Sequence, residues 1–215
     1  GITLTSLRRH HDGKVPCGII EDQPRFDWRG QHLDCARHFY EVDFILRLLD
    51  VMAMVKLNRF HWHFADDEAF RLELESLPEL ARTHFRGEGE LIPGVFGGGA
   101  RSGGCYSKAD VRRVVEHGKA LGIEIMPEIE VPAHALALAE IFTASRDSQD
   151  KGQEISVQGY AKNVMNPAMP ESWRVWEAAT REVAETFPFG VVHLGGDELP
   201  EETWMHSPAA RTLMT

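Results

Sequence analysis

Strand-like and helical segments alternate four times along this chain, and acidic side chains follow each strand-like segment. Short runs bounded by turn-forming residues predict strands at 31–34, 57–64, 123–127 and 191–194. Apolar residues at helical spacing predict helices at 41–56, 108–121, 132–142 and 171–187. Ser107 stands at the N-cap position of the second helix, and Gly122 follows its last turn. This alternation predicts an α/β fold with a parallel sheet.

The acidic residues indicate which α/β fold to expect. They are Asp34, Asp66, Asp67, Glu128, Glu130, Asp197 and Glu198. In a barrel of parallel strands all C-terminal strand ends open on one face, which carries the chemistry. A doubly wound sheet would need a phosphate loop, but glycines 97–99 and 103–104 lack G-x-G-x-x-G spacing between a strand and a helix. We therefore predict a TIM (β/α)8 barrel in which these glycines form a mobile loop.

Chain length sets how much of a barrel can be present. A complete barrel takes ~250 residues and eight strands, whereas this chain has 215 residues and about four predicted β/α units. We expect residues 23–215 to be the N-terminal half of a (β/α)8 catalytic domain, and residues 1–22 to be a leader from a preceding region. An open half-barrel exposes two strand edges. Either a C-terminal half or a second chain is expected to complete it.

Composition excludes several classes of function. The formal net charge is −10, and no basic stripe is available for phosphate contacts, so no nucleic-acid partner is expected. No apolar run approaches the ~20 residues of a membrane span, and no signal peptide is recognisable. The three cysteines include no C-x-x-C pair and indicate no disulfide framework. The cellular compartment therefore stays open.

The most informative acidic pair is Asp197 and Glu198, directly after Gly195 and Gly196. Neighbouring residues of an extended segment point to opposite faces, so one carboxyl can face a reacting bond while the other holds a neighbouring group. This division suits a sugar site. Since no second carboxyl is compelled to act as nucleophile, a substrate with a 2-acetamido group would supply its own. The alternative is a turn before a helix N-terminus, where acidic residues are favoured.

Histidines follow or occupy the predicted strands. His134 lies just past the third strand, where it could bridge Asp66 and Glu198 or serve as an ordinary structural histidine. His61 and His63 share one face of the second strand at a spacing that can bind zinc. A metal-dependent barrel hydrolase is therefore the alternative function, although no second histidine cluster at metal-ligand spacing follows.

Four ordered motifs resemble those of family 20 glycoside hydrolases, the β-N-acetylhexosaminidases. The motifs are residues 24–39, 56–67, 127–134 and 193–198. The resemblance implies a (β/α)8 barrel with no metal and no cofactor. It also implies hydrolysis of terminal non-reducing N-acetylglucosamine or N-acetylgalactosamine from an oligosaccharide or glycoconjugate. Members of this family are often periplasmic, secreted or lysosomal.

The resemblance implies roles for single residues. Glu198 is the expected general acid/base, and Asp197 is expected to hold the 2-acetamido N–H. The acetamido oxygen would then attack the anomeric carbon, giving an oxazolinium intermediate that water opens with net retention. Asp66 and His134 are the expected relay behind Glu198. The expected substrate-binding residues are Arg29, Asp67 and His63.

The chain departs from the family pattern at several positions. Ala133 stands where glycine is usual, Glu130 where aspartate is usual, and Phe70 replaces a common tryptophan. The tryptophans, tyrosine and acidic residue that the family carries on later strands cannot be mapped. We therefore expect this chain alone to be inactive or very weak. A half-barrel that binds sugar without turnover is the third possibility.

Overall fold

The computed structural model describes residues 7–86 and 102–215. At its centre is a parallel sheet in the order β1–β2–β5, formed by Gly30–Asp34, Arg59–His63 and Glu124–Glu128. Asp34 pairs with His63, and His63 pairs with Glu128. Three predicted strands are thus confirmed, and their C-terminal ends lie level with one another.

The fourth predicted strand, at 191–194, is not a regular strand. This segment runs parallel to the end of β5 and contacts it through a single bridge between Glu128 and His193. The supporting hydrogen bonds include His193 N to Pro127 O (2.9 Å) and Val131 N to Leu194 O (3.1 Å). Val191 and Leu194 stay 44% exposed, because no neighbour covers them in the described part of the chain. The four-unit half-barrel is therefore not shown.

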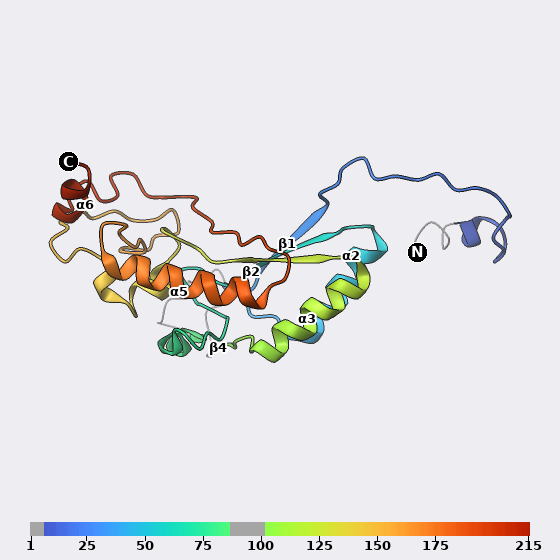
Figure 1. The fold of residues 1–215 in the computed structure, drawn as a ribbon, viewed down its shortest axis with the longest axis horizontal. Coiled ribbons are helices and arrows are strands. Elements are labelled where there is room, and N and C mark those ends of the chain that lie inside the picture. Colours follow the sequence, from blue (N-terminus) through green and yellow to red (C-terminus); the bar gives the residue numbers. More distant parts are fainter. Residues whose placement is uncertain (1–6, 87–101) are drawn as a thin grey trace.

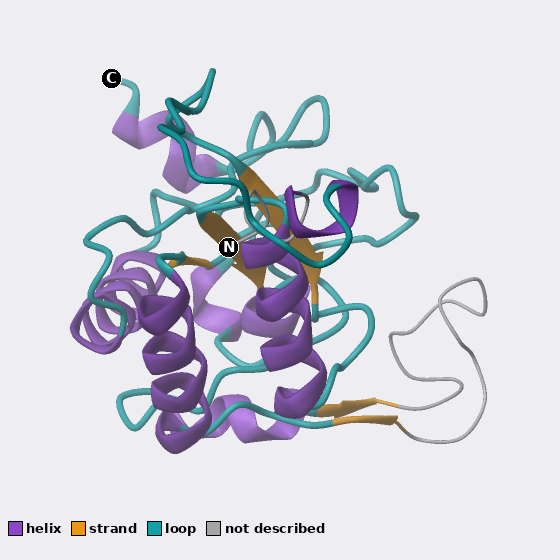
Figure 2. Cartoon of the chain, turned by 90° about the vertical axis from the view of Figure 1, so that its right-hand side faces the viewer, coloured by secondary structure: helices purple, strands orange, loops and turns teal. Residues whose placement is uncertain are grey.

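Three helices lie along one side of the sheet (Figures 1 and 2). They are α2 (Val42–Met54), α3 (Lys108–Leu121) and α5 (Pro170–Thr186). The predicted caps of α3 are present, since Ser107 and Asp110 form a reciprocal capping box and Gly122 adopts φ 73°. Each helix buries its apolar stripe and leaves its charged face in solvent.

The helix predicted at 132–142 is wrong for most of its length. Only α4 (Leu136–Ala139) is helical. His134 adopts φ 49°, a left-handed conformation that a right-handed helix cannot contain. The chain therefore turns at His134 before α4 begins, and this turn directs the imidazole toward the strand ends.

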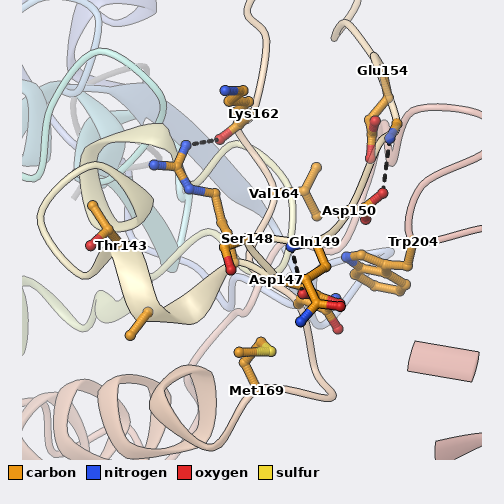
Figure 3. Close-up of a pocket in the computed structure, with 14 residues that line it drawn as sticks. Thr143, Asp147, Ser148, Gln149, Asp150, Glu154, Lys162, Val164, Met169 and Trp204 are labelled. Carbon is orange, nitrogen blue, oxygen red and sulfur yellow. Dashed lines mark hydrogen bonds between the residues drawn. The ribbon is translucent and has the colours of Figure 1, made fainter. Parts of the chain in front are cut away.

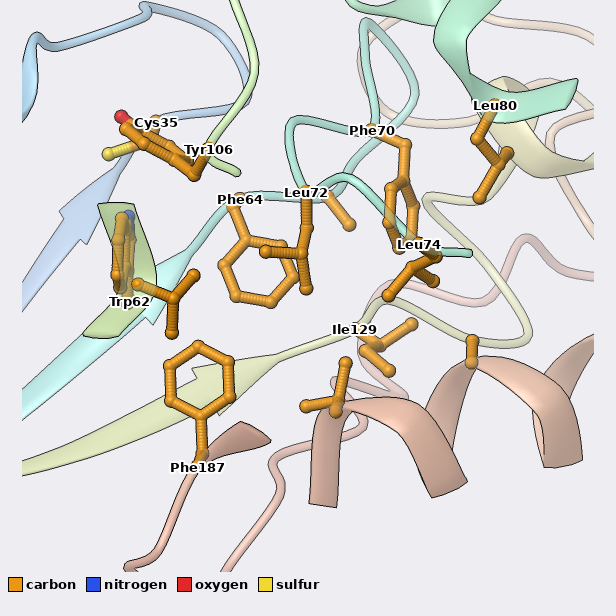
Figure 4. Close-up of a cluster of buried hydrophobic side chains, with 14 of the residues drawn as sticks. Cys35, Trp62, Phe64, Phe70, Leu72, Leu74, Leu80, Tyr106, Ile129 and Phe187 are labelled. Carbon is orange, nitrogen blue, oxygen red and sulfur yellow. The ribbon is translucent and has the colours of Figure 1, made fainter. Parts of the chain in front are cut away.

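Strand β2 separates the hydrophobic core from the polar side of the sheet. Phe60 and Trp62 are fully buried on the core side, where Trp62 meets Tyr106 edge-on at 4.6 Å between ring centroids. Figure 4 shows Trp62 and Tyr106 together with Phe64 and Phe187. The rings of Phe64 and Phe187 stack with 6.2 Å between their centroids. His61 and His63 alternate with the core residues and point to the other face.

The remaining short elements lie around this frame. They are η1 (Pro78–Thr83), the antiparallel pair β3 (Phe85–Arg86) and β4 (Ser102–Gly103), η3 (Thr143–Ser145) and α6 (Pro208–Leu213). The glycines at 97–99, predicted to be in a mobile loop, lie outside the described residues. The described part of the predicted leader extends away from the sheet (Figure 1), and the boundary at residue 23 stays a prediction. No helix in the described ranges is both long and apolar enough to cross a membrane.

Candidate active site

A cavity of about 550 Å³ opens at the C-terminal ends of the strands. Histidines and carboxylates from β1, β2, β5 and the segment after residue 191 line it, together with Arg37 and Gln158. A second cavity of about 800 Å³ lies between residues 143–169 and Trp204 (Figure 3). Neither histidine nor cysteine is among the residues that line this second cavity. The chemistry-bearing side chains therefore converge on the smaller cavity.

His134 joins Asp66 to Glu198. Its Nδ1 lies 3.2 Å from Asp66 Oδ1, and its Nε2 lies 3.2 Å from Glu198 Oε2. Burial alone lowers the pKa of His134, but the carboxylates of Asp66 and Asp67 outweigh it and raise the pKa to about 11. With this pKa the imidazole carries a proton at neutral pH, so its Nδ1 donates to Asp66 and its Nε2 forms an ion pair with Glu198. The structure brings together the three residues that the sequence placed in a relay.

Asp197 and Glu198 sit on a turn with an unusual backbone. Gly195 and Gly196 have φ values of 65° and 87°, and Glu198 has φ 49°, so three of four consecutive residues occupy the left-handed region. A Cβ on Gly195 would overlap the carboxylate of Glu130. The side chains of Asp197 and Glu198 remain 63% and 46% exposed. Both carboxylates thus reach the cavity opening, with His134 behind them.

Asp66 is buried and held by several donors. His63 Nε2 and Arg37 Nη2 lie 2.9 Å and 2.8 Å from its Oδ2, while the backbone N–H of Asp67 donates to Oδ1 at 2.6 Å. Burial alone would raise the pKa of Asp66, yet His134, His63 and Arg37 lower it to about 2. Asp66 is therefore a fixed negative charge that orients His134.

Arg37 is a residue of this cavity that the sequence analysis missed. It follows β1, and its guanidinium pairs with Asp34, Asp66 and Glu68 at 3.1, 2.8 and 2.9 Å. The available signal was its place just after the C-terminal end of the first strand, where α/β folds carry functional residues. Arg29, the arginine predicted from the sequence, stands at the opposite end of the same strand.

Arg29 was predicted to bind substrate, but it does not line the cavity that contains Asp197 and Glu198. It precedes β1, so it lies at the N-terminal end of the sheet. Its Nε donates to Lys56 O, and its Nη1 donates to Phe26 O, each at 2.6 Å. The guanidinium satisfies backbone carbonyls of two connecting segments, and it does not line the cavity.

The two other predicted substrate-binding residues are also committed to protein contacts. Asp67 is fully buried and accepts hydrogen bonds from Leu136 N (3.0 Å) and Asn163 Nδ2 (3.1 Å). His63 lines the cavity but engages Glu128 and Asp66 with its two ring nitrogens. Neither presents a free polar atom to a ligand. Asp67 anchors the turn before α4, and His63 supports Asp66.

The sheet also places a cluster of histidines around Glu128. His61 Nε2 and His63 Nδ1 lie 2.8 Å and 2.5 Å from Glu128 Oε2, and His193 Nδ1 lies 2.6 Å from Oε1. The potential ligand atoms of His61, Glu128 and His193 are close enough to share a metal ion. Among the described residues, His61 and His63, the pair suggested by the sequence, do not occur together in any one group whose ligand atoms could share a metal ion.

Glu130 differs from the other buried carboxyls. Burial and the negative charge of Glu128 raise its pKa to about 8, and its Oε2 has no hydrogen-bond partner. The neutral acid packs beneath Gly195. The absence of a side chain at residue 195 is therefore what lets the turn approach Glu130 this closely.

Comparison with known proteins identifies what the chain is similar to. Residues 26–215 match the family described as "Glycosyl hydrolase family 20, catalytic domain". The beta-hexosaminidase of Vibrio furnissii is 38% identical over 203 residues, which are 93% of this chain and 33% of that protein. The beta-hexosaminidase of Akkermansia muciniphila is 35% identical over 220 residues, which are 99% and 43%. The chain thus spans less than half the length of these relatives.

Solved structures agree with the sequence comparison. The exo beta-N-acetylglucosaminidase of Vibrio harveyi, in complex with N-acetylglucosamine, has 41% identity and a TM-score of 0.85 over 90% of this chain and 31% of its own. A further structure, described as a beta-N-acetylhexosaminidase, has 32% identity and a TM-score of 0.82 over 99% and 44%. Both structures therefore share the fold of this chain over 90% or more of its length, with sequence identities of 41% and 32%.

Proposed function

Because this chain belongs to glycosyl hydrolase family 20, whose catalytic domain is a TIM barrel, we propose that it supplies the acid/base half of a β-N-acetylhexosaminidase active site. The reaction is hydrolysis of a terminal non-reducing N-acetylhexosamine, with the 2-acetamido group of the substrate as nucleophile. The observation that carries this proposal is the contact series from Asp66 through His134 to Glu198.

The substrate class follows from the chemistry and from the relatives. Relatives of this chain carry the names beta-hexosaminidase and N,N'-diacetylchitobiase, and a similar structure holds N-acetylglucosamine. We propose an oligosaccharide or glycoconjugate that ends in such a sugar as the substrate of this protein too. The cavity has the polarity that a sugar requires, since its walls carry donors and acceptors rather than an apolar surface.

Glu198 is proposed as the general acid/base. It would give its proton to the glycosidic oxygen as the bond to the anomeric carbon breaks, and it would later accept a proton from the attacking water. The protonated His134 stabilises the carboxylate that remains after the first transfer. Asp66, held negative by its donors, keeps His134 in this orientation.

Asp197 is proposed to bind the acetamido group. It precedes Glu198 on the same turn, with its Oδ2 3.9 Å from the same His134 Nε2 that Glu198 approaches. As an acceptor it would take the acetamido N–H and increase the electron density on the acetamido oxygen, which attacks the anomeric carbon. Arg37, which lines the cavity beside Asp66, replaces Arg29 as the proposed donor to sugar hydroxyls.

The remaining strand–helix units are proposed to complete the pocket. We use "complete domain" for the protein with all eight units of the barrel. The proposed domain division keeps residues 23–215 as its N-terminal half and 1–22 as a preceding segment. The two open edges of the sheet would pair with the other half.

The experiment is the Glu198→Gln variant of the complete domain, assayed with an aryl N-acetylglucosaminide. Loss of a positioned general acid/base costs ~10²–10⁴-fold in rate, so kcat should fall within that range while the melting temperature stays unchanged. Near-normal turnover would remove Glu198 from this role. Treatment with a chelator separates the metal-dependent alternative, because a zinc hydrolase would lose activity and the proposed enzyme would keep it.

A further inference from the structure

Two buried residues continue the contact series beyond Asp66, although the proposed mechanism does not use them. His63 Nε2 lies 2.9 Å from Asp66 Oδ2, and His63 Nδ1 lies 2.5 Å from Glu128 Oε2. The side chains of both His63 and Glu128 are 4% exposed. The series from Glu128 to Glu198 therefore runs through polar contacts alone, with solvent excluded from all but its last member.

The charges along this series alternate. Burial alone lowers the pKa of His63, but its hydrogen bonds to Asp66 and Glu128 raise the pKa to about 10. Burial opposes the ionisation of Glu128, yet His61 and His63 hold the pKa of its carboxyl well below its usual range. The series behind Glu198 therefore alternates in charge: Glu128 and Asp66 are negative, and His63 and His134 are positive. Each of these groups contacts the next one in the series.

Glu128 has a second connection to the turn that carries Glu198. Its Oε1 lies 2.6 Å from Nδ1 of His193, which is two residues before Gly195. The backbone supports this contact, because Ile129 N donates to His193 O at 3.0 Å. One carboxylate thus fixes both His63 and the segment that leads into the catalytic turn.

We propose that Glu128 and His63 are positioning residues for Glu198, acting through Asp66 and His134. This inference rests on the proposed function, since it assigns a purpose to residues behind the proposed acid/base. Neither residue touches substrate. Glu128 fixes the ring of His63, His63 fixes the carboxylate of Asp66, and Asp66 orients His134 toward Glu198.

The first test compares Glu128→Gln and His63→Gln with the unsubstituted complete domain on two substrates. The phenyl N-acetylglucosaminide needs a proton on its leaving group, whereas the 2,4-dinitrophenyl compound does not. If the series positions the acid, kcat/KM should fall about 10- to 100-fold for the phenyl substrate. For the dinitrophenyl substrate it should fall less than about threefold, because departure of that group needs no acid.

The matched control is Glu182→Gln. Glu182 is another buried carboxylate, which accepts hydrogen bonds from Glu75 N and Ser76 N at 2.9 Å each, but it lies outside the cavity. Its loss should lower the melting temperature without any dependence on the leaving group. Equal losses on both substrates for Glu128→Gln, as for a structural variant, would overturn the inference.

A double variant tests whether the residues act through His134. On a His134→Ala background, His63→Gln should change kcat/KM less than about twofold, since the contact that transmits its effect is already gone. Full additivity would contradict the inference. Glu128→Gln is not used on this background, because Glu128 also contacts His193 beside the turn. If His63→Gln does not fold, His63→Asn on the same background gives the same test with Glu128 intact.

The outcomes also separate this inference from the proposed function. If Glu198→Gln keeps its activity, the proposed function fails whatever the other variants do. If Glu198→Gln loses activity while Glu128→Gln and His63→Gln show no leaving-group dependence, only the inference about the positioning residues fails.

Discussion

At the scale of single residues, neighbouring carboxyls in one cavity hold opposite protonation states. Asp66 receives hydrogen bonds from His63, His134 and a backbone N–H, and its pKa falls to about 2. Glu130 is equally buried, but its Oε2 finds no donor and its pKa rises to about 8. Hydrogen-bond donors and the sign of the neighbouring charges, rather than depth of burial, therefore decide which carboxyl is charged.

Glu130 should make the complete domain less stable as pH rises. The pKa of its carboxyl is 4.5 ordinarily and about 8 in the folded protein, so the folded state holds a proton that the unfolded state releases. The free energy of unfolding should therefore fall between about pH 4.5 and pH 8. Glu130→Gln keeps the side chain neutral, so thermal melting at pH 5 and pH 8.5 should show a smaller decline than in the parent. The exposed Glu201→Gln should melt like the parent, and an unchanged decline in Glu130→Gln would refute this expectation.

The two glycines of the catalytic turn should respond differently to alanine. A methyl group on Gly195 meets the Glu130 carboxylate, whereas the nearest atom to one on Gly196 is Val131 O at 3.9 Å. Both substitutions carry the left-handed penalty of ~1–2 kcal/mol, but only Gly195→Ala must also displace Glu130 and the turn. We expect kcat to fall at least about tenfold more for Gly195→Ala than for Gly196→Ala. Equal losses in steady-state kinetics would mean that the contact with Glu130 is unimportant.

At the scale of elements, the sequence predicted correctly those helix ends that depend on neighbouring residues alone. The bounds of α3 follow from its capping box and its C-terminal glycine, and both are present in the structure. The predicted helix at 132–142 failed because Asp67 and Asp66, which are distant in sequence, hold Leu136 N and the ring of His134. These tertiary contacts outweigh helical periodicity. Arg29 was predicted from its place just before β1, whereas the residues that line the cavity lie at the opposite end of that strand.

The α3 cap should contribute to stability without affecting catalysis. Ser107→Ala removes the hydroxyl that accepts from Asp110 N, which should cost about 1 kcal/mol of unfolding free energy. Urea denaturation measures this loss. Arg112→Ala, at an exposed position of the same helix, should stay within about 0.5 kcal/mol of the parent. A fall in kcat for Ser107→Ala would indicate that α3 does more than support the sheet.

At the scale of the whole molecule, the turn that carries Asp197 and Glu198 lies beside β5, at one edge of the central sheet. The sheet has three strands in the described residues, and the fourth segment contacts it through one bridge. The sequence indicated the family and a TIM barrel, and the comparisons confirm both. The rest of the sugar pocket was not predicted, because the later residues that the family resemblance implies could not be mapped onto this sequence, which covers 33% and 43% of the two relatives from Vibrio furnissii and Akkermansia muciniphila.

The 215-residue chain alone should therefore turn over substrate very slowly. Asp197 and Glu198 are 63% and 46% exposed, and exposure to water weakens the electrostatic interactions that a closed pocket provides. We expect no hydrolysis of an aryl N-acetylglucosaminide above the background in a continuous absorbance assay. The complete domain is the positive control. Ordinary enzyme rates from the isolated chain would show that the remaining units are dispensable.

The alternation along β2 has a consequence for how this protein can vary over evolution. Phe60 and Trp62 belong to the core, while His61 and His63 face the cavity. Insertion or deletion of one residue in β2 would exchange the two faces of the strand. The imidazoles would then lie in the hydrophobic core, and the aromatic rings would lie in the cavity. Length changes in this strand should therefore be purged by selection even where single substitutions are tolerated. New substrate preferences would then arise in the connecting loops, which can lengthen or shorten without moving the strand.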